Sequence, residues 1–141
     1  MISITTFDTE IKALIAGIDD LQYKRVTTEK QAVNKLKDAD GIQLVVVVPS
    51  FDTSGKLNMS VDDATTFFFV IEKYKTGATD AEDLNIYERT QAVLEILKDR
   101  LIDKATDGCS IFYRLNPQSI HIDPEYNTFG GFSGWSMALS F

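Results

Sequence analysis

The chain has 141 residues and a formal net charge of −7, with 44% hydrophobic and 25% charged residues. This length is typical of one domain, residues 1–141, which buries about two thirds of its unfolded surface. The negative charge disfavours nucleic-acid phosphates and anionic membrane surfaces as partners. The one cysteine, Cys109, cannot form an internal disulfide, and the N-terminus lacks a signal-peptide pattern. We therefore expect a cytoplasmic protein.

Two short helices are predicted before the first strongly apolar run. Residues 6–18 are predicted to form a helix with one apolar face, made of Phe7, Ile11, Leu14, Ile15 and Ile18. A second helix, over residues 28–39, begins with the capping-box pattern Thr28-Glu29-Lys30-Gln31. Its apolar stripe is narrow, with only Val33 and Leu36, so we expect a mostly solvated outer helix.

Two apolar runs mark the centre of the predicted sheet. They are residues 42–48, which end at Pro49, and residues 65–74. Both are rich in β-branched and aromatic residues and neither alternates with polar residues, so each strand needs cover on both faces. No helical pattern separates the two runs, and this predicts that the strands pair antiparallel.

The segment between these strands, residues 49–64, is predicted to be a long loop. Leu57, Met59 and Val61 alternate with polar residues, so part of the segment could continue as an outlying strand ribbon. Because long loops in compact domains are usually functional, Phe51, Leu57 and Met59 are candidate interaction residues.

A long helix over residues 80–104 and a β meander complete the predicted fold. The helix begins with a second capping-box pattern, Thr79 to Glu82, and carries a wide apolar arc. The meander comprises residues 109–115, a short strand at 120–122 that ends at Asp123-Pro124, a loop over 123–131, and a final strand at 135–141.

The final strand has one large and one small face. Trp135, Met137, Leu139 and Phe141 form the large face, and the other face holds only small residues. A flat small-residue face lets a helix or a neighbouring subunit approach closely. The candidate interaction residues here are Trp135, Ser136, Ala138 and Ser140.

These elements predict an α+β domain with a mostly antiparallel sheet of about five strands and two or three helices. One of the helices is mostly polar, so three helices provide too little apolar surface to cover both faces of the sheet. We expect that the sheet either curls on itself or completes one face against another subunit.

No motif in the chain predicts catalytic chemistry, and we expect no catalytic, cofactor or metal site. Cys109 and His121 could meet across a hairpin as nucleophile and base, but a small buried cysteine and a surface histidine are the favoured interpretation. Residues 123–127 place oxygen side chains at alternate positions, yet Thr128 stands where a calcium loop needs glycine. The glycine-rich residues 130–134 precede a strand, whereas phosphate loops precede a helix.

The order of elements resembles that of phage or prophage neck and tail-completion proteins of the tail-terminator type. The features that carry the resemblance are the N-terminal helix, the segment 49–64, the helix 80–104 and the closing strand 134–141. The resemblance implies a homo-oligomeric ring, often hexameric, that caps the tail tube and meets the head connector without catalytic residues. Segment 49–64 would then face the ring lumen or a neighbouring protein, and the helix at 28–39 is a departure from the family layout.

Two alternatives remain open. One is a small-molecule or peptide-binding module, with a pocket between the helix 80–104 and the sheet lined by Tyr87, Tyr113, Tyr126 and Trp135. The other, which is weaker, is a hydrolase or transferase that uses Cys109 or His121.

Overall fold

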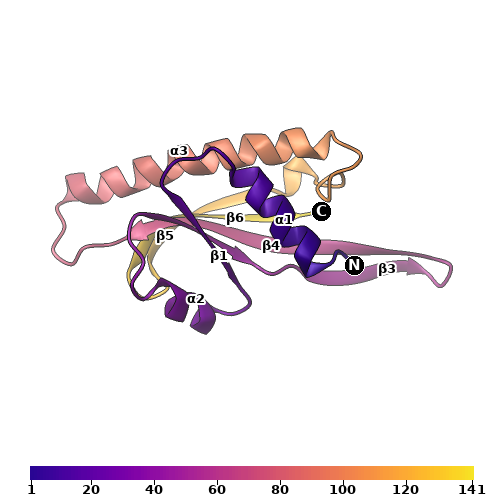
Figure 1. Ribbon diagram of the computed structural model, residues 1–141, viewed down its shortest axis with the longest axis horizontal. Helices are drawn as coiled ribbons and strands as arrows, with labels where there is room; N and C mark the ends of the chain where they lie inside the picture. The colour runs from indigo at the N-terminus through magenta and orange to yellow at the C-terminus, as the bar shows by residue number, and fades with distance from the viewer.

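The computed structural model describes residues 1–141 as one six-stranded sheet with three α-helices (Figure 1). The strand order is β1-β2-β4-β6-β5, and β3 pairs with β4 as well. Only β1 and β2 are parallel, so the predicted mostly antiparallel α+β fold is confirmed, with one strand more than expected. The elements are α1 (Ile4–Ile15), β1 (Leu21–Val26), α2 (Glu29–Leu36), β2 (Ile42–Val47), β3 (Ser50–Lys56), β4 (Met59–Lys73), α3 (Asp80–Ala105), the 3₁₀ turn η1 (Pro117–Ser119), β5 (His121–Thr128) and β6 (Phe132–Ser140).

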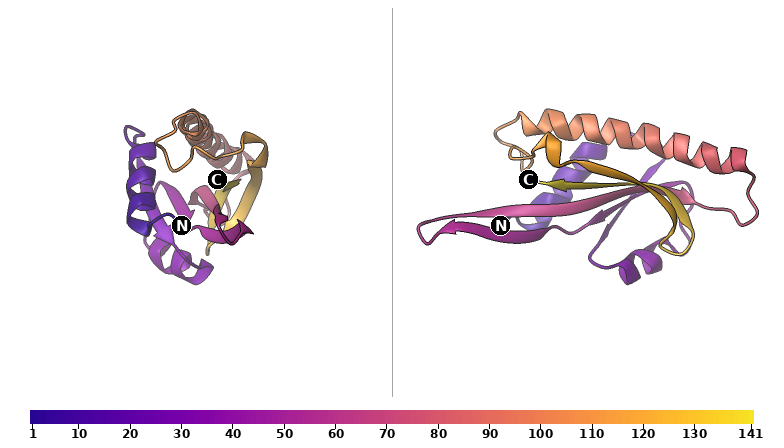
Figure 2. Two further views of the ribbon diagram at one scale, coloured as in Figure 1. Left: turned by 90° about the vertical axis from the view of Figure 1, so that its right-hand side faces the viewer. Right: turned by 180° about the vertical axis from the view of Figure 1, so that it is seen from behind.

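The helices cover the two faces of the sheet unequally. The main core joins α1 and α3 to one face, and Leu44, Phe68 and Met137 are fully buried within it. The opposite face has only α2, whose Ala32 and Leu36 join a smaller core of six buried residues. Figures 1 and 2 show this short helix at one end of the sheet, far from the β3–β4 hairpin.

Side-chain caps fix the starts of the helices. In α3 the predicted capping box is complete: Thr79 Oγ1 accepts from the Glu82 N–H, and the Glu82 carboxylate accepts from the Thr79 N–H. In α2, Thr28 accepts from the Gln31 N–H as predicted. The Gln31 side chain, however, accepts from the N–H of Thr27, so only half of the predicted box forms.

β1 is the strand that sequence patterns do not predict. It lies at the edge of the sheet, parallel to β2, and only Val26 in it is fully buried. Lys24 and Arg25 interrupt the apolar alternation that identifies a half-buried strand. Its place in the sheet follows from hydrogen bonding to the strongly apolar β2.

The segment 49–64 is a β-hairpin, which corrects the predicted long loop. β3 and the first part of β4 pair in register from Ser50↔Thr65 to Lys56↔Met59, and Leu57-Asn58 form the turn. The possible outlying ribbon is therefore present and longer than the alternation suggested. The prediction of a loop was wrong because the ribbon is solvated on both sides, so it carries little hydrophobic signal.

The last third of the chain differs from the predicted meander at two places. Residues 109–115 form turns that bury Ser110, Phe112 and Leu115, so the predicted strand there is wrong. β5 runs through Asp123-Pro124 to Thr128, where a loop was expected. Proline is tolerated at that position because β5 is an edge strand and one side of it needs no hydrogen-bond donor.

Candidate interaction surface

The two sides of β4 meet different surroundings. Phe68 and Val70 point into the main core and are fully buried. Phe67 and Phe69 point to the other face, where Phe67 remains 43% exposed. The run therefore needs cover on both faces, as its sequence indicates, but α2 covers the second face only near Ile71.

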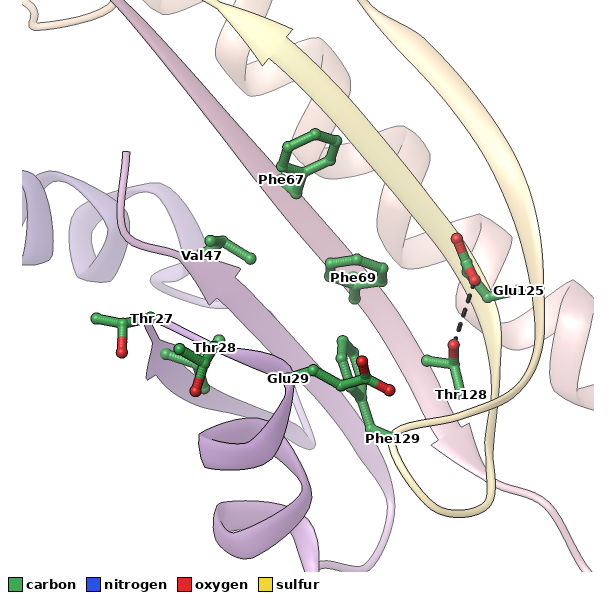
Figure 3. A pocket seen from close by; sticks show the side chains of 10 residues that line it. Thr27, Thr28, Glu29, Val47, Phe67, Phe69, Glu125, Thr128 and Phe129 are labelled. Atoms are coloured by element: carbon green, nitrogen blue, oxygen red, sulfur yellow. Dashed lines mark hydrogen bonds between the residues drawn. The ribbon is translucent and has the colours of Figure 1, made fainter. Parts of the chain in front are cut away.

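A groove occupies this incompletely covered face (Figure 3). It encloses about 450 Å³ beside the start of α2 and the β5–β6 turn. The ring of Phe129 lies edge-on to Phe69, with 4.9 Å between ring centroids. A left-handed backbone at Asn127 and Phe129 folds this turn back toward β4. The lining residues are Val26, Thr27, Thr28, Glu29, Val47, Phe67, Phe69, Glu125, Thr128 and Phe129.

The groove has apolar walls and two carboxylates. Glu29 and Glu125 both line it, and neither forms a salt bridge within the chain. Thr128 Oγ1 donates a hydrogen bond to Glu125 Oε2 at 3.4 Å. This is the only side-chain hydrogen bond that either carboxylate forms with another lining residue. The surface therefore suits a ligand that is apolar in its body and cationic at one point.

Three of the predicted interaction residues extend this face along β6. Ala138 is paired with Phe67 and Ser136 with Phe69, while Ser140 lies opposite Thr65. Paired residues of neighbouring strands share a face, so the small side of β6 continues the side of β4 that carries Phe67 and Phe69. Ala138 and Ser140 are partly exposed there, whereas Ser136 is buried. Trp135 lies on the opposite face, where its Nε1–H donates to the Tyr87 carbonyl at 3.0 Å.

The remaining predicted interaction residues lie on the hairpin. Leu57 at the turn is fully exposed, and Met59 beside it is 78% exposed. Phe51, at the base, packs against the main core. Five residue pairs, from Asp52↔Asp63 to Lys56↔Met59, extend past that base, and at about 3.4 Å per residue they span roughly 17 Å. Figure 2 shows the ribbon projecting beyond the body of the domain.

The base of the hairpin is fixed to the C-terminal strand and the turns before it. Ala64 and Phe141 exchange two backbone hydrogen bonds, of 2.7 and 2.9 Å. Arg114 binds the Asp63 carboxylate at 2.8 Å. Near the tip, Gly55 has φ +110°, and a Cβ there would lie 2.4 Å from the Met59 carbonyl oxygen. The ribbon thus has a defined direction and, at Gly55 in β3, a backbone conformation that only glycine permits.

A charged cluster at the other edge of the sheet joins α1 to β1. The Asp8 carboxylate contacts Lys12 at 2.7 Å and Arg25 at 2.9 Å, and it accepts from the Tyr23 hydroxyl at 3.0 Å. The hydrogen bond from Lys12, with help from Tyr23 and Arg25, lowers the pKa of Asp8 below its ordinary value of 3.8. Burial and the Asp8 hydrogen bond raise the pKa of Tyr23.

We expect Asp8→Asn to lower the free energy of unfolding at pH 7 by about 1–2 kcal/mol, because it weakens charge-assisted hydrogen bonds. A carboxyl whose pKa is lower in the folded state stabilises the protein above its unfolded pKa and loses this effect as the pH falls through its folded pKa. The difference between wild type and variant should therefore be constant near neutrality and shrink below about pH 4. Urea unfolding of wild type and variant at pH 7 and pH 3 measures this difference in the free energy of unfolding. An equal difference at both pH values would contradict this role of Asp8.

The residues considered for catalysis lie apart in the structure. Cys109 is exposed in the turns after α3, so the expected buried position is wrong, and it lines a cavity that does not include His121. His121 Nε2 lies 3.0 Å from the Asp123 carboxylate at the start of β5. No group of three or more His, Cys, Asp or Glu side chains is arranged to hold a metal ion.

The four aromatic residues considered for a ligand pocket do not line one cavity. Tyr87 and Trp135 pack edge-to-face between α3 and the sheet, with centroids 5.9 Å apart. Tyr126 packs against Tyr74 in the same manner at 5.4 Å. Tyr113 is 56% exposed in the turns after α3. The groove along Phe67 and Phe69 was not predicted, although both residues stand at alternate positions of the doubly apolar run.

Comparisons with known proteins leave this chain without a matched relative. No family model, no curated protein and no solved structure matches it significantly. None of the helices is both long and apolar enough to cross a membrane.

Proposed function

We propose that this chain is a non-enzymatic assembly protein that forms a homo-oligomeric ring, as phage tail terminators do. The observation that carries the proposal is the uncovered face of β4, where Phe67 is 43% exposed beside Phe69 and the small side of β6. A central strand with aromatic residues on its open face is typical of a surface that a partner covers. Tail-tube and head-connector proteins would be the further partners of such a ring.

The edges of the sheet favour contact through its face. β5, at one edge, carries Pro124 and has Asp123 and Glu125 beside it, all of which oppose pairing with another strand. At the other edge, Lys35 Nζ donates a hydrogen bond to the carbonyl oxygen of Arg25 in β1. β3 pairs only with β4, so its outer side is the edge that remains open. The exposed face of β4 and the hairpin are therefore the surfaces favoured for assembly.

Light scattering on the purified protein tests this proposal. We expect a mass that is a multiple of the 15.8 kDa monomer, and closed rings in negative-stain micrographs. Phe67→Ser should reduce the oligomer at least tenfold at a given concentration without changing the melting temperature by more than a few degrees. Ile96→Ser is the matched control, because Ile96 is also 43% exposed but lies on α3. Monomeric wild type at millimolar concentration would overturn the proposal.

A second candidate function is a small-molecule or peptide-binding module. The groove volume of about 450 Å³ favours it, because ligand sites commonly enclose about 300–1,000 Å³. A thermal-shift screen of small molecules, run on wild type and on the monomeric Phe67→Ser variant, distinguishes ligand binding from assembly. A compound that stabilises wild type and leaves the variant unchanged would support ligand binding.

A further inference from the structure

The most exposed apolar residues of the β3–β4 hairpin lie at its tip, with Val61 two residues beyond Met59, and a second apolar site lies further along β4. At the hairpin tip, Leu57 is fully exposed and Met59 is 78% exposed. The second site is the groove around Phe67, eight residues further along β4. At about 3.3 Å per residue the continuous strand holds the two places roughly 26 Å apart. The tip of one chain therefore cannot reach the groove of the same chain.

We infer that the tip of one copy of this chain binds in the groove of the next copy. This rests on the proposed homo-oligomeric function and identifies its contact. Leu57 and Met59 would fill the space between Phe67, Phe69 and Phe129. A thioether adapts well to aromatic walls, and sulfur–aromatic contacts stabilise such packing.

The charges of the tip and the groove are complementary. Lys56, the last residue of β3, is exposed and forms no salt bridge within its own chain. The groove has the carboxylates of Glu29 and Glu125, which also lack a cationic partner. Seating Leu57 and Met59 in the groove brings Lys56 to its rim, where the ammonium group would meet these carboxylates. Such complementarity fixes orientation and disfavours wrong partners.

This contact has consequences for the symmetry of the assembly. Tip and groove are different surfaces, and every copy offers one of each. Two copies that exchange tips reciprocally would form a closed two-fold dimer, whereas a one-way contact between copies is heterologous. Repetition of a heterologous contact closes into a ring where the rotation permits and otherwise continues as a filament. The contact thus supplies the kind of interface that a ring requires.

A mixing experiment tests the contact. The tip variant carries Leu57→Ser and Met59→Ser and keeps its groove, and the groove variant carries Phe67→Ser and keeps its tip. Each alone should be monomeric. Their equimolar mixture should form a dimer of twice the monomer mass and nothing larger. The tip of the groove variant binds the groove of the tip variant, and no further intact tip or groove remains in that dimer. Circular dichroism melts confirm that both variants fold, which is expected because the replaced side chains are exposed.

Disulfide trapping locates the contact. Both partners carry Cys109→Ser, one carries Leu57→Cys and the other Thr128→Cys in the groove. A covalent dimer from this pair, and none when Thr128→Cys is replaced by Leu84→Cys on the exposed side of α3, supports the inference. If wild type forms oligomers but the variants do not combine and the groove cysteine is not trapped, the inference is overturned while assembly stands. Monomeric wild type without trapping overturns both.

Discussion

Replacing Gly134 with alanine should lower the free energy of unfolding by about 3 kcal/mol or more, because it combines backbone strain with overpacking. Gly134 has φ +152° on β6, and its Cβ would lie 2.2 Å from the Val70 carbonyl oxygen and 3.2 Å from Thr90 Oγ1. Val70 is held in the β4–β6 pairing and Thr90 is fully buried on α3, so neither neighbour can move without disturbing the core. The melting temperature should fall by roughly 10 °C.

Gly131→Ala is the matched control for this prediction. Gly131 also has a left-handed backbone, with φ +122°, but nothing lies within 4 Å of a Cβ placed there. The Gly131→Ala variant should lose only about 1 kcal/mol of its free energy of unfolding, which is the effect of the backbone conformation alone. Calorimetric melts of both variants measure the difference. Equal melting temperatures would show that β4 and α3 do not enclose Gly134 as closely as described.

Phe68→Ala should lower the free energy of unfolding by about 3–5 kcal/mol, because it leaves a cavity in the main core. Phe68 is fully buried between α3 and the sheet and is paired with Met137 on β6 and Val46 on β2. Its neighbour Phe67 points to the open face, so Phe67→Ala should change the stability of the monomer by less than about 1 kcal/mol. Urea unfolding under dilute, monomeric conditions measures both. A larger loss for Phe67→Ala would contradict the assignment of the two faces.

Hydrophobic period and helix caps made most of the fold predictable from sequence. The Thr79 and Thr28 caps and the apolar arcs placed all three helices within a few residues. β2 and the inner half of β4 were predicted because their residues are apolar on both faces. These elements share a property: local sequence and tertiary burial favour the same conformation.

The missed elements are those in which local sequence and burial disagree. β1 carries Lys24 and Arg25 at an edge, and β3 is solvated, so neither has a complete apolar period. Residues 109–115 do alternate, but Phe112 and Leu115 are buried by turns that no local pattern indicates. Pairing with a neighbouring strand decided the structure of β1 and β3, and packing of Phe112 and Leu115 in the main core decided that of residues 109–115.

The candidate surface could be predicted only in part. The small side of β6 and the residues Leu57 and Met59 were recognised because their patterns are local. The groove depends on the return of Phe129 over Phe69 and on the absence of a helix over Phe67, and both follow from tertiary arrangement. The predicted shortage of helical cover was the nearest signal in the sequence.

The central claim is that the open side of β4 becomes an intermolecular contact. Hydroxyl-radical footprinting at high and low protein concentration tests it most directly, because Phe67 and Ile96 are each 43% exposed in the single chain. We predict that labelling of Phe67 is several-fold lower at high than at low protein concentration, and that labelling of Ile96 is the same at both. Labelling of Phe67 that stays constant relative to Ile96 over the whole concentration range would contradict the claim.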